Sequence, residues 1–299
     1  MLGATIVRGG LAAVAALAAA ALVTAIPAQG APAGPAAPAV GGGTASPSET
    51  PTPTPTDTPT PTPTPTTSVP PDDRLLPDLI ALPASQLSVQ VRSDGNRLRF
   101  SSSLGNIGAG PIEVRPNNLM PCPEGQHNST QIIYRDVNAN GRYNWAKDTS
   151  FTRHRAGCMI YHPLHHHWHF KASARYELLD PSQDHEVVVA ARRKVSFCLR
   201  DTGRVPERYG SFGYPEAYGS CTRTSPQGIS VGWMDVYQSF LAGQSLTLPK
   251  NLADGLYCLR TVVDPINQLV EGNDDNNESV RALRIHGTRV VARPNTLCR

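Results

Sequence analysis

The sequence predicts a mostly β protein, an antiparallel β-sandwich with long irregular loops that follows a signal peptide and a disordered linker. Three observations support this fold class. Short runs alternate apolar and polar residues, turn-forming residues separate them, and no long amphipathic helical pattern competes. Alternation with a period of two gives a strand one buried face. Many short strands divided by turns are typical of sandwiches with Greek-key-like connections.

The predicted strands share this alternation or a β-branched and aromatic composition. They span residues 87–92, 97–101, 111–114, 131–134, 167–179, 186–191, 194–199, 245–248, 256–263, 280–285 and 288–292. Glycine next to Asn or Asp marks turns at 94–96, 140–141 and 254–255. Residues 209–244 are rich in glycine and predict a long irregular loop, which in a compact domain usually carries function.

The first 70 residues have a different character from the rest. Residues 1–31 read as a secretory signal peptide, because Arg8 precedes an apolar run that ends in small residues. The run is shorter than the roughly 20 residues of a membrane span, and an uncleaved anchor is the alternative. Residues 32–70 are rich in Pro and Thr, and proline cannot donate to a sheet or helix, which predicts a disordered linker. We expect residues 71–299 to form one folded domain.

Charge and cysteine content narrow the class of protein. The formal net charge of +3 is too small for the dense basic surface of a nucleic-acid-binding protein. All six cysteines lie in the domain, and an even number behind a signal peptide predicts disulfides in a secreted protein. The sequence leaves their pairing open. After signal cleavage we expect no membrane association, although the linker could hold the domain near a cell wall.

The most informative segment is a histidine run, with four histidines at 165–169. His165, His167 and His169 alternate, so a strand would direct their imidazoles to one face and the residues between them to the other. Imidazole binds copper, zinc, nickel and iron. The sequence therefore predicts a metal site, and a surface histidine run without an ion is the alternative. His162, three residues earlier, is either a neighbour of that site or an ordinary loop histidine.

A second candidate metal site precedes the histidines. Asp136, Asn138 and Asn140 supply oxygens at the first, third and fifth positions of a calcium-loop pattern, and glycine follows at the sixth. The acid that closes such a loop should stand at Lys147, but Asp148 comes one place late. Calcium is one interpretation, and an Asn/Asp-rich turn is the slightly favoured alternative.

Four blocks in the domain resemble the lysyl oxidase family. Residues 162–180, with the histidine run and then Tyr-Glu-Leu-Leu-Asp, are similar to its copper-binding segment. Residues 194–202 resemble its Lys-Ala-Ser-Phe-Cys-Leu-Glu-Asp-Thr motif, and residues 227–237 its Gln-Gly … Asp-Thr-Tyr segment. Residues 264–277 resemble its Asn-Pro … Leu-Val-Pro-Glu … Asn-Asn segment. The blocks keep the family's order and spacing from about residue 76 to residue 298.

The resemblance implies a secreted copper-dependent amine oxidase. Such an enzyme deaminates primary amines, either peptidyl lysine or small amines, to aldehydes with O₂ as acceptor, releasing ammonia and H₂O₂. Its cofactor is lysine tyrosylquinone, and the matching positions are Lys194 and Tyr237. Without the resemblance we would read these two as a surface lysine and a core tyrosine.

Asp235 is the candidate general base, since a carboxylate two residues before Tyr237 could reach a substrate proton. A turn-forming aspartate is the alternative interpretation. An exposed, mildly acidic cleft is also expected for amine substrates, and Asp274, Asp275 and Glu278 are candidates for it.

The cysteine pattern departs from that of the animal enzymes. Leu164, Gly203 and Trp233 stand where those enzymes have additional cysteines, so the disulfide framework here is thinner. From the resemblance we take only the pair Cys198–Cys221. The pairs Cys122–Cys158 and Cys258–Cys298 complete the set as a hypothesis.

Two other functions compete with the oxidase. A secreted β-sandwich that binds copper or zinc without turnover would use the same histidines but would need neither Lys194 nor Tyr237. A zinc hydrolase is disfavoured, because the sequence has no HExxH motif and no obvious base beside the histidines.

Overall fold

The computed structural model describes residues 72–117, 121–182 and 187–298, apart from the side chains of residues 172–173 and 193–197. The chain divides into two units, Met1–Thr66 and Thr67–Arg299, and the described residues all belong to the second. The predicted signal peptide and linker lie outside the described residues. Within the described part, no helix is both long and apolar enough to cross a membrane.

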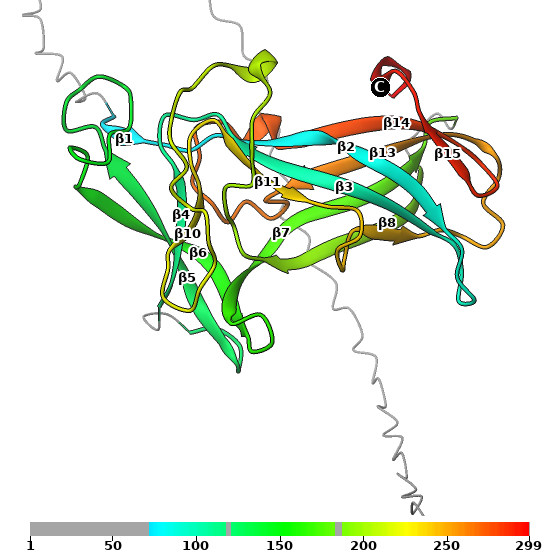
Figure 1. Cartoon of the computed structure of the whole chain (residues 1–299), viewed down its shortest axis with the longest axis horizontal. Helices are drawn as coiled ribbons and strands as arrows, with labels where there is room; N and C mark the ends of the chain where they lie inside the picture. Colours follow the sequence, from blue (N-terminus) through cyan, green and yellow to red (C-terminus); the bar gives the residue numbers. More distant parts are fainter. Residues whose placement is uncertain (1–71, 118–120, 183–186, 299) are drawn as a thin grey trace, which may run out of the picture. The chain divides into compact units, whose positions relative to one another are not determined.

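The domain is mostly β, and its strands form two antiparallel sheets, which confirms the predicted fold class (Figure 1). The larger sheet runs in the order β10-β4-β5-β6-β7-β13-β14-β15, with β1 added on β5 and β8 on β7. Its strands are β1 (Arg74–Leu75), β4 (Ile112–Asn117), β5 (Gln126–Arg135), β6 (Phe151–His162), β7 (His167–Asp180), β8 (Val187–Phe197), β10 (Gln227–Ile229), β13 (Gly255–Val263), β14 (Glu278–His286) and β15 (Arg289–Ala292).

The smaller sheet is built around one long central strand. β3 (Arg97–Asn106) pairs with β2 (Leu79–Gln90) on one edge, and with β11 (Trp233–Tyr237) and β12 (Ser245–Thr247) on the other. β9 (Gly203–Arg204) extends the sheet beyond β11. Three short 3₁₀ helices, η1 (Glu207–Tyr209), η2 (Asp274–Asn276) and η3 (Asn295–Leu297), lie in the connections.

Two groups of buried apolar side chains fill the space along the sheets. One includes Trp168 and Phe170 of β7 together with Leu79, Leu104 and others from both sheets. The second is formed around Tyr176 and contains Phe100, whose ring meets the Tyr176 ring edge-on at 4.9 Å. Each fully buried aromatic or leucine side chain contributes on the order of 2 kcal/mol by leaving water. β7 therefore crosses both apolar groups and anchors the sandwich.

Most predicted strands are confirmed, with three corrections. Residues 186–199 do not form two strands, because β8 runs continuously from Val187 to Phe197. β6 was not predicted from sequence. Its alternation is interrupted at Gly157, which has a φ of +72° beside the bulge in the β5–β6 pairing. Glycine adopts this conformation without the steric cost that a Cβ would bring.

The third correction concerns residues 209–244. This segment is not wholly irregular, because it contains β10 and β11. Both strands are short, so periodicity over three to five residues gave no signal. They form because β4 and β3 offer them exposed edges with which to pair. β11 matters most, since it carries Asp235 and Tyr237.

The structure confirms all three predicted disulfides. Cys122–Cys158, Cys198–Cys221 and Cys258–Cys298 join Cα atoms 6.1, 6.2 and 5.8 Å apart. Disulfides form and persist mainly in oxidising compartments, so the pairing is consistent with an extracellular location.

Candidate active site

The histidine cluster is built at the end of a β-hairpin. His162 ends β6 and pairs with His167, the first residue of β7, and residues 163–166 form the turn between them. The amides of His165 and His166 both donate to the carbonyl of His162, and His166 has a φ of +59°. His165 therefore projects from the turn and not from a strand, which corrects the prediction that all three alternate along one strand. Alternation does hold for His167 and His169, because Trp168 between them is buried.

The ring nitrogens of the three predicted ligands converge on one point. His169 Nε2 lies 3.2 Å from both His165 Nδ1 and His167 Nε2, and the three ligand atoms all lie within 4.8 Å of one another. Imidazole nitrogens bind a metal at about 2.0–2.1 Å, which places neighbouring ligand atoms about 3 Å apart. The spacing observed here therefore fits three nitrogens around a single ion.

His162 belongs to the same cluster. Its ring stacks on that of His165 with centroids 3.8 Å apart, and its centroid lies 5.0 Å from that of His169. Its Nδ1 atom is buried and has no hydrogen-bond partner among the described residues. An unpartnered buried nitrogen is costly unless something occupies the space beside it. His162 is thus a neighbour of the three predicted ligands and not an isolated loop histidine.

Burial disfavours the protonated form of His167 and His169. Desolvation lowers the pKa of His167, and the nearby His165 adds to the effect. Desolvation, followed by the proximity of His167, lowers the pKa of His169 to about 4. A neutral imidazole offers its lone pair to a metal, whereas a protonated one cannot. Burial therefore favours the cation-binding form of His167 and His169.

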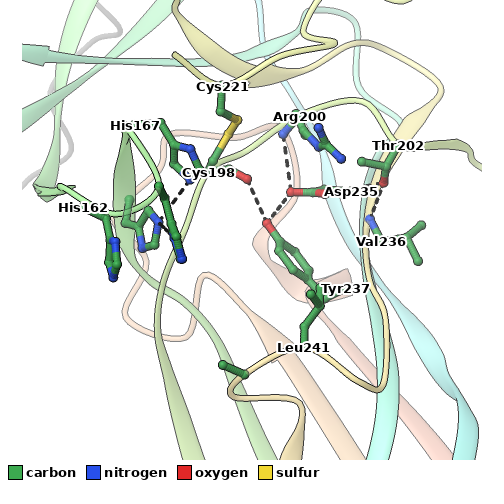
Figure 2. Close-up of a pocket in the computed structure, with 13 residues that line it drawn as sticks. His162, His167, Cys198, Arg200, Thr202, Cys221, Asp235, Val236, Tyr237 and Leu241 are labelled. Carbon is green, nitrogen blue, oxygen red and sulfur yellow. Dashed lines mark hydrogen bonds between the residues drawn. A yellow bond between two sulfur atoms is a disulfide. The ribbon is translucent and has the colours of Figure 1, made fainter. Parts of the chain in front are cut away.

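A cavity of about 570 Å³ lies beside the cluster and includes all four histidines in its wall. Figure 2 shows the imidazoles on one side of it, and Asp235 with Tyr237 on the other. The Tyr237 hydroxyl donates to Asp235 Oδ2 and also lies 3.1 Å from the carbonyl oxygen of Cys198. Strand β11 of the smaller sheet therefore presents two of the predicted catalytic residues to the histidines of the larger one.

Burial also shapes the chemistry of the phenol. Tyr237 is 8% exposed and Asp235 is 2% exposed. Desolvation, reinforced by the Asp235 carboxylate, raises the pKa of Tyr237 well above its usual value. The phenol is therefore protonated at neutral pH and holds its proton against the carboxylate. Asp235 is the group in direct contact with that proton.

A comparison with known protein families identifies the domain. The family model described as lysyl oxidase matches residues 123–294, more than half of the 299-residue chain. The chain belongs to the lysyl oxidase family. The match begins before β6 and ends after β15, so it covers the hairpin, the cavity and both predicted cofactor positions.

Curated lysyl oxidase homologs show the same similarity. Lysyl oxidase homolog 2 of Gallus gallus is 27% identical over 168 residues, which cover 55% of this chain and 18% of that protein. Lysyl oxidase homolog 4 of Mus musculus is 26% identical, and lysyl oxidase homolog 3 of Homo sapiens is 25% identical, each over 197 residues. These cover 64% of this chain and 19% of each homolog. The chain thus spans about a fifth of the length of the curated relatives it matches.

Lys194 is the other predicted cofactor residue of this lysyl oxidase domain, and the structure describes only its backbone. Lys194 lies on β8 and pairs with Ala174 of β7, and its side chain is outside the description. Ala174 lines a small internal cavity together with Tyr176 and Tyr237. The backbone of Lys194 is therefore paired directly with Ala174, and Ala174 lines the same small cavity as Tyr237.

Two polar wall residues were not singled out from the sequence. Arg200 and Thr202 line the cavity beside the predicted Cys198–Cys221 disulfide. The Thr202 hydroxyl accepts from the amide of Val236 at 2.6 Å, which ties this segment to β11. Arg200 and Thr202 lie within the block 194–202, so the resemblance marked the segment but not their side chains.

A buried aspartate fixes the loop that brings Cys221 to the cavity. Asp201 is 4% exposed and accepts from the amides of Ala217, Tyr218 and Ser230, and from the Ser230 hydroxyl. A buried carboxylate needs such donors to offset its desolvation. Asp201 therefore has a structural explanation that the sequence did not reveal.

The acidic residues expected near the site lie elsewhere. Asp274 and Asp275 are in η2 and Glu278 begins β14, and none of the three lines the cavity. Among the described residues of the cavity wall, Asp235 is the only acid. The expectation of an acidic cleft built from these three residues is therefore wrong.

The Asp136 loop forms a compact turn held by its own polar groups. Asp136 Oδ2 accepts from the amide of Gly141, and Asn140 Oδ1 accepts from that of Arg142 at 2.9 Å. Asp148 accepts from the amide of Val137 at 3.0 Å and closes the loop. These contacts account for the Asp and Asn residues as turn formers. Calcium binding by Asp136, Asn138 and Asn140 stays a prediction.

Proposed function

We propose that this chain is a secreted copper-dependent amine oxidase that deaminates primary amines to aldehydes with release of ammonia and H₂O₂. One observation carries the proposal. Three imidazoles with the spacing of metal ligands and the hydroxyl of a buried tyrosine line the same cavity, which is large enough for a substrate side chain. Family membership supports the oxidase chemistry.

His165, His167 and His169 would hold the copper ion. Imidazole is a preferred ligand of copper, and three protein ligands leave positions open for a small molecule, as in catalytic zinc sites. The choice of copper over zinc rests on the family and on the need for a redox-active ion. His162, stacked on His165, would fix the orientation of that ring.

Lys194 and Tyr237 are the proposed precursors of lysine tyrosylquinone. Once formed, this cofactor would supply an electrophilic carbonyl and accept two electrons, which no ordinary side chain can do. The position of Lys194 beside Ala174 supports the pairing, because Ala174 and Tyr237 line one internal cavity.

Asp235 is the proposed general base. Its carboxylate lies in the cavity wall and contacts the Tyr237 hydroxyl, so it is within reach of any group bound at that oxygen. The hydrogen bond from the Arg200 amide to Oδ2, at 3.4 Å, helps to hold its orientation. A positioned carboxylate that accepts a proton in the transition state accelerates such a step by about 10²- to 10⁴-fold.

The proposed substrates are lysine side chains of extracellular proteins or small primary amines, with O₂ as the second substrate. Export would follow from a signal peptide at residues 1–31, and residues 32–70 would be the linker to the catalytic domain at 71–299. Cell-wall association through the linker is part of the same proposal.

The test is direct detection of the cofactor. Copper-loaded protein should react with phenylhydrazine and release H₂O₂ when a primary amine is added. Lys194→Arg keeps the charge but cannot form the crosslink, so labelling should disappear. Mass spectrometry of digested wild-type protein should then show the peptides of Lys194 and Tyr237 joined. Labelling that survives in Lys194→Arg would refute the assignment of the crosslink.

The competing function is a β-sandwich that binds copper or zinc without turnover. The histidine geometry fits this function equally well. Copper binding without labelling, without a joined peptide and without H₂O₂ would establish it in place of the oxidase.

A further inference from the structure

One end of the cavity beside the histidines has an apolar wall. Leu241 and Ala242 form it, and both belong to the turn of residues 238–244 that joins β11 to β12. Figure 2 shows Leu241 beneath Tyr237 and, in this view, at the opposite end of the cavity from Arg200. An amine that reacts at Tyr237 would therefore have its carbon chain within reach of Leu241.

Hydrogen bonds fix the backbone of the turn that carries Leu241. The Arg99 guanidinium of β3 donates to the carbonyl of Ser239 at 2.6 Å and to that of Leu241 at 3.0 Å. The amide of Leu241 donates to the carbonyl of Gln238 at 3.0 Å, and the amide of Gln244 donates to the carbonyl of Leu241 at 3.2 Å. The Leu241 side chain is nevertheless 37% exposed. A carbon chain that contacts it would remove this apolar surface from water, which is favourable.

The charged groups of the described cavity wall do not suit a second ammonium group. Asp235 is the only acid among the described residues of the wall, and it is 2% exposed and accepts from Tyr237. Arg200 is the only lysine or arginine among the same residues, and it is exposed. An ammonium group placed against Leu241 would lose water without gaining a partner, which costs free energy. The wall therefore fits an amine that has one charge and an uncharged tail.

We propose that Leu241 and Ala242 form a subsite for the hydrocarbon tail of the substrate, so that the protein prefers aliphatic monoamines to diamines of the same length. The inference rests on the proposed amine oxidase function and narrows its substrate class. The preference is a difference between two free energies, because burial of a methyl end against Leu241 is favourable and burial of an ammonium group there is not. Leu241 determines the specificity, and Arg99 positions it.

The experiment compares hexylamine with hexamethylenediamine on copper-loaded protein, because the two differ only by the second amino group. The kcat/KM for H₂O₂ release should be higher for the monoamine. Leu241→Asp adds an acid at the apolar end, and Leu241→Asn adds an uncharged group of nearly the same shape. The ratio of kcat/KM for monoamine over diamine should be about fivefold lower in Leu241→Asp than in Leu241→Asn, the upper range for an exposed charge pair. Val291→Asp, at an exposed position of β15, is the control and should keep the wild-type ratio.

A binding measurement separates this inference from the proposed function. A tertiary amine cannot be deaminated by the proposed chemistry, so dimethylhexylamine and dimethylbutylamine report binding alone. In calorimetry, wild-type protein should bind the hexyl compound more tightly, by up to about fourfold for each additional methylene group that is buried. Leu241→Asn should reduce this difference.

Two results would overturn the subsite. They are equal affinity of wild-type protein for the two tertiary amines, and the same kcat/KM ratio in Leu241→Asp and Leu241→Asn. Release of H₂O₂ from either primary amine would leave the oxidase intact in both cases. Leu241-dependent binding without H₂O₂ release from either primary amine would support the subsite and reject the oxidase.

Discussion

Two regions of the molecule bury the same pair of chemical groups, a carboxylate and a tyrosine hydroxyl. In the cavity wall, Tyr237 donates to Asp235. In the larger sheet, Tyr134 and Tyr218 donate to Glu113 at 2.9 and 2.8 Å, and Arg115 completes that cluster with an ion pair. Both carboxylates are almost fully buried, at 2% and 1% exposed respectively.

The difference between the two regions lies in what surrounds each pair. Glu113 is enclosed by two tyrosines and an arginine, so its contacts stabilise the packing of β4, β5 and the loop that carries Tyr218. Asp235 and Tyr237 instead line a cavity shared with four histidines. Burial raises the pKa of Tyr134 and of Tyr237 alike. The open cavity and the neighbouring histidines, and not the pair itself, therefore distinguish the proposed reactive site from the enclosed pair at Glu113.

The largest expected effect is a difference in activity between substitutions of Tyr237 and of Tyr134. Tyr237→Phe should abolish phenylhydrazine labelling and amine-dependent H₂O₂ release, because a phenylalanine in its place has no hydroxyl from which the proposed quinone could form. Tyr134→Phe likewise removes a hydroxyl that donates to a buried carboxylate, that of Glu113, and should retain both signals. Labelling and peroxide assays on the two purified variants make the comparison. Retained labelling in Tyr237→Phe would show that the carbonyl group is elsewhere.

Substitution of the two carboxylates should affect different properties: the catalytic rate for Asp235, and the stability of the fold for Glu113. Asp235→Asn should lower kcat by about 10²- to 10⁴-fold if the carboxylate moves a proton. Glu113→Gln removes the buried charge that accepts from Tyr134, Tyr218 and the half-exposed Arg115, and should lower the free energy of unfolding by about 1–3 kcal/mol. Urea unfolding and peroxide release, measured on both variants, test this division. A folded Asp235→Asn protein with wild-type kcat would exclude Asp235 as the base.

Metal binding should stabilise the cavity region through the histidines. Copper at about 1,000 times its dissociation constant should raise the free energy of unfolding of wild-type protein by about 4 kcal/mol. His169→Ala should lose most of this gain, because His169 Nε2 lies between the other two ligand atoms. His154→Ala, a half-buried histidine elsewhere on β6, should keep it. Equal copper stabilisation in both variants would place the ion away from the triad.

The smallest expected effect is on alkaline stability. Burial, with Glu113 adding to it, raises the pKa of Tyr134 from 10.0 to about 12. Between these pH values the unfolded chain releases a proton that the folded chain keeps, so the free energy of unfolding falls as pH rises from about 10 towards 12. Tyr134→Phe should therefore show a shallower loss of stability over this range. Urea unfolding at several alkaline pH values measures the slope, and an unchanged slope would contradict the assignment.

Much of the fold and part of the site follow from local patterns in the sequence. Alternation located most of the long strands, and the even cysteine count predicted disulfides. The histidine run predicted the cluster of His165, His167 and His169, although the structure places His165 in the turn and adds the stacked ring of His162. β6 and β11 escaped prediction, because a bulge at Gly157 breaks the period of one and the other is only five residues long.

The sequence by itself determined the β class of the domain and the segment that carries the histidine cluster, because both depend on residues that are close neighbours along the chain. Only the tertiary structure decided that Asp235, Tyr237 and Arg200 meet the histidines in one cavity. These residues lie 31 or more positions after His169, on a strand of the other sheet and on a segment fixed by Asp201 and a disulfide. Contacts at such separations arise from sheet pairing and the packing of buried side chains, which no local pattern records.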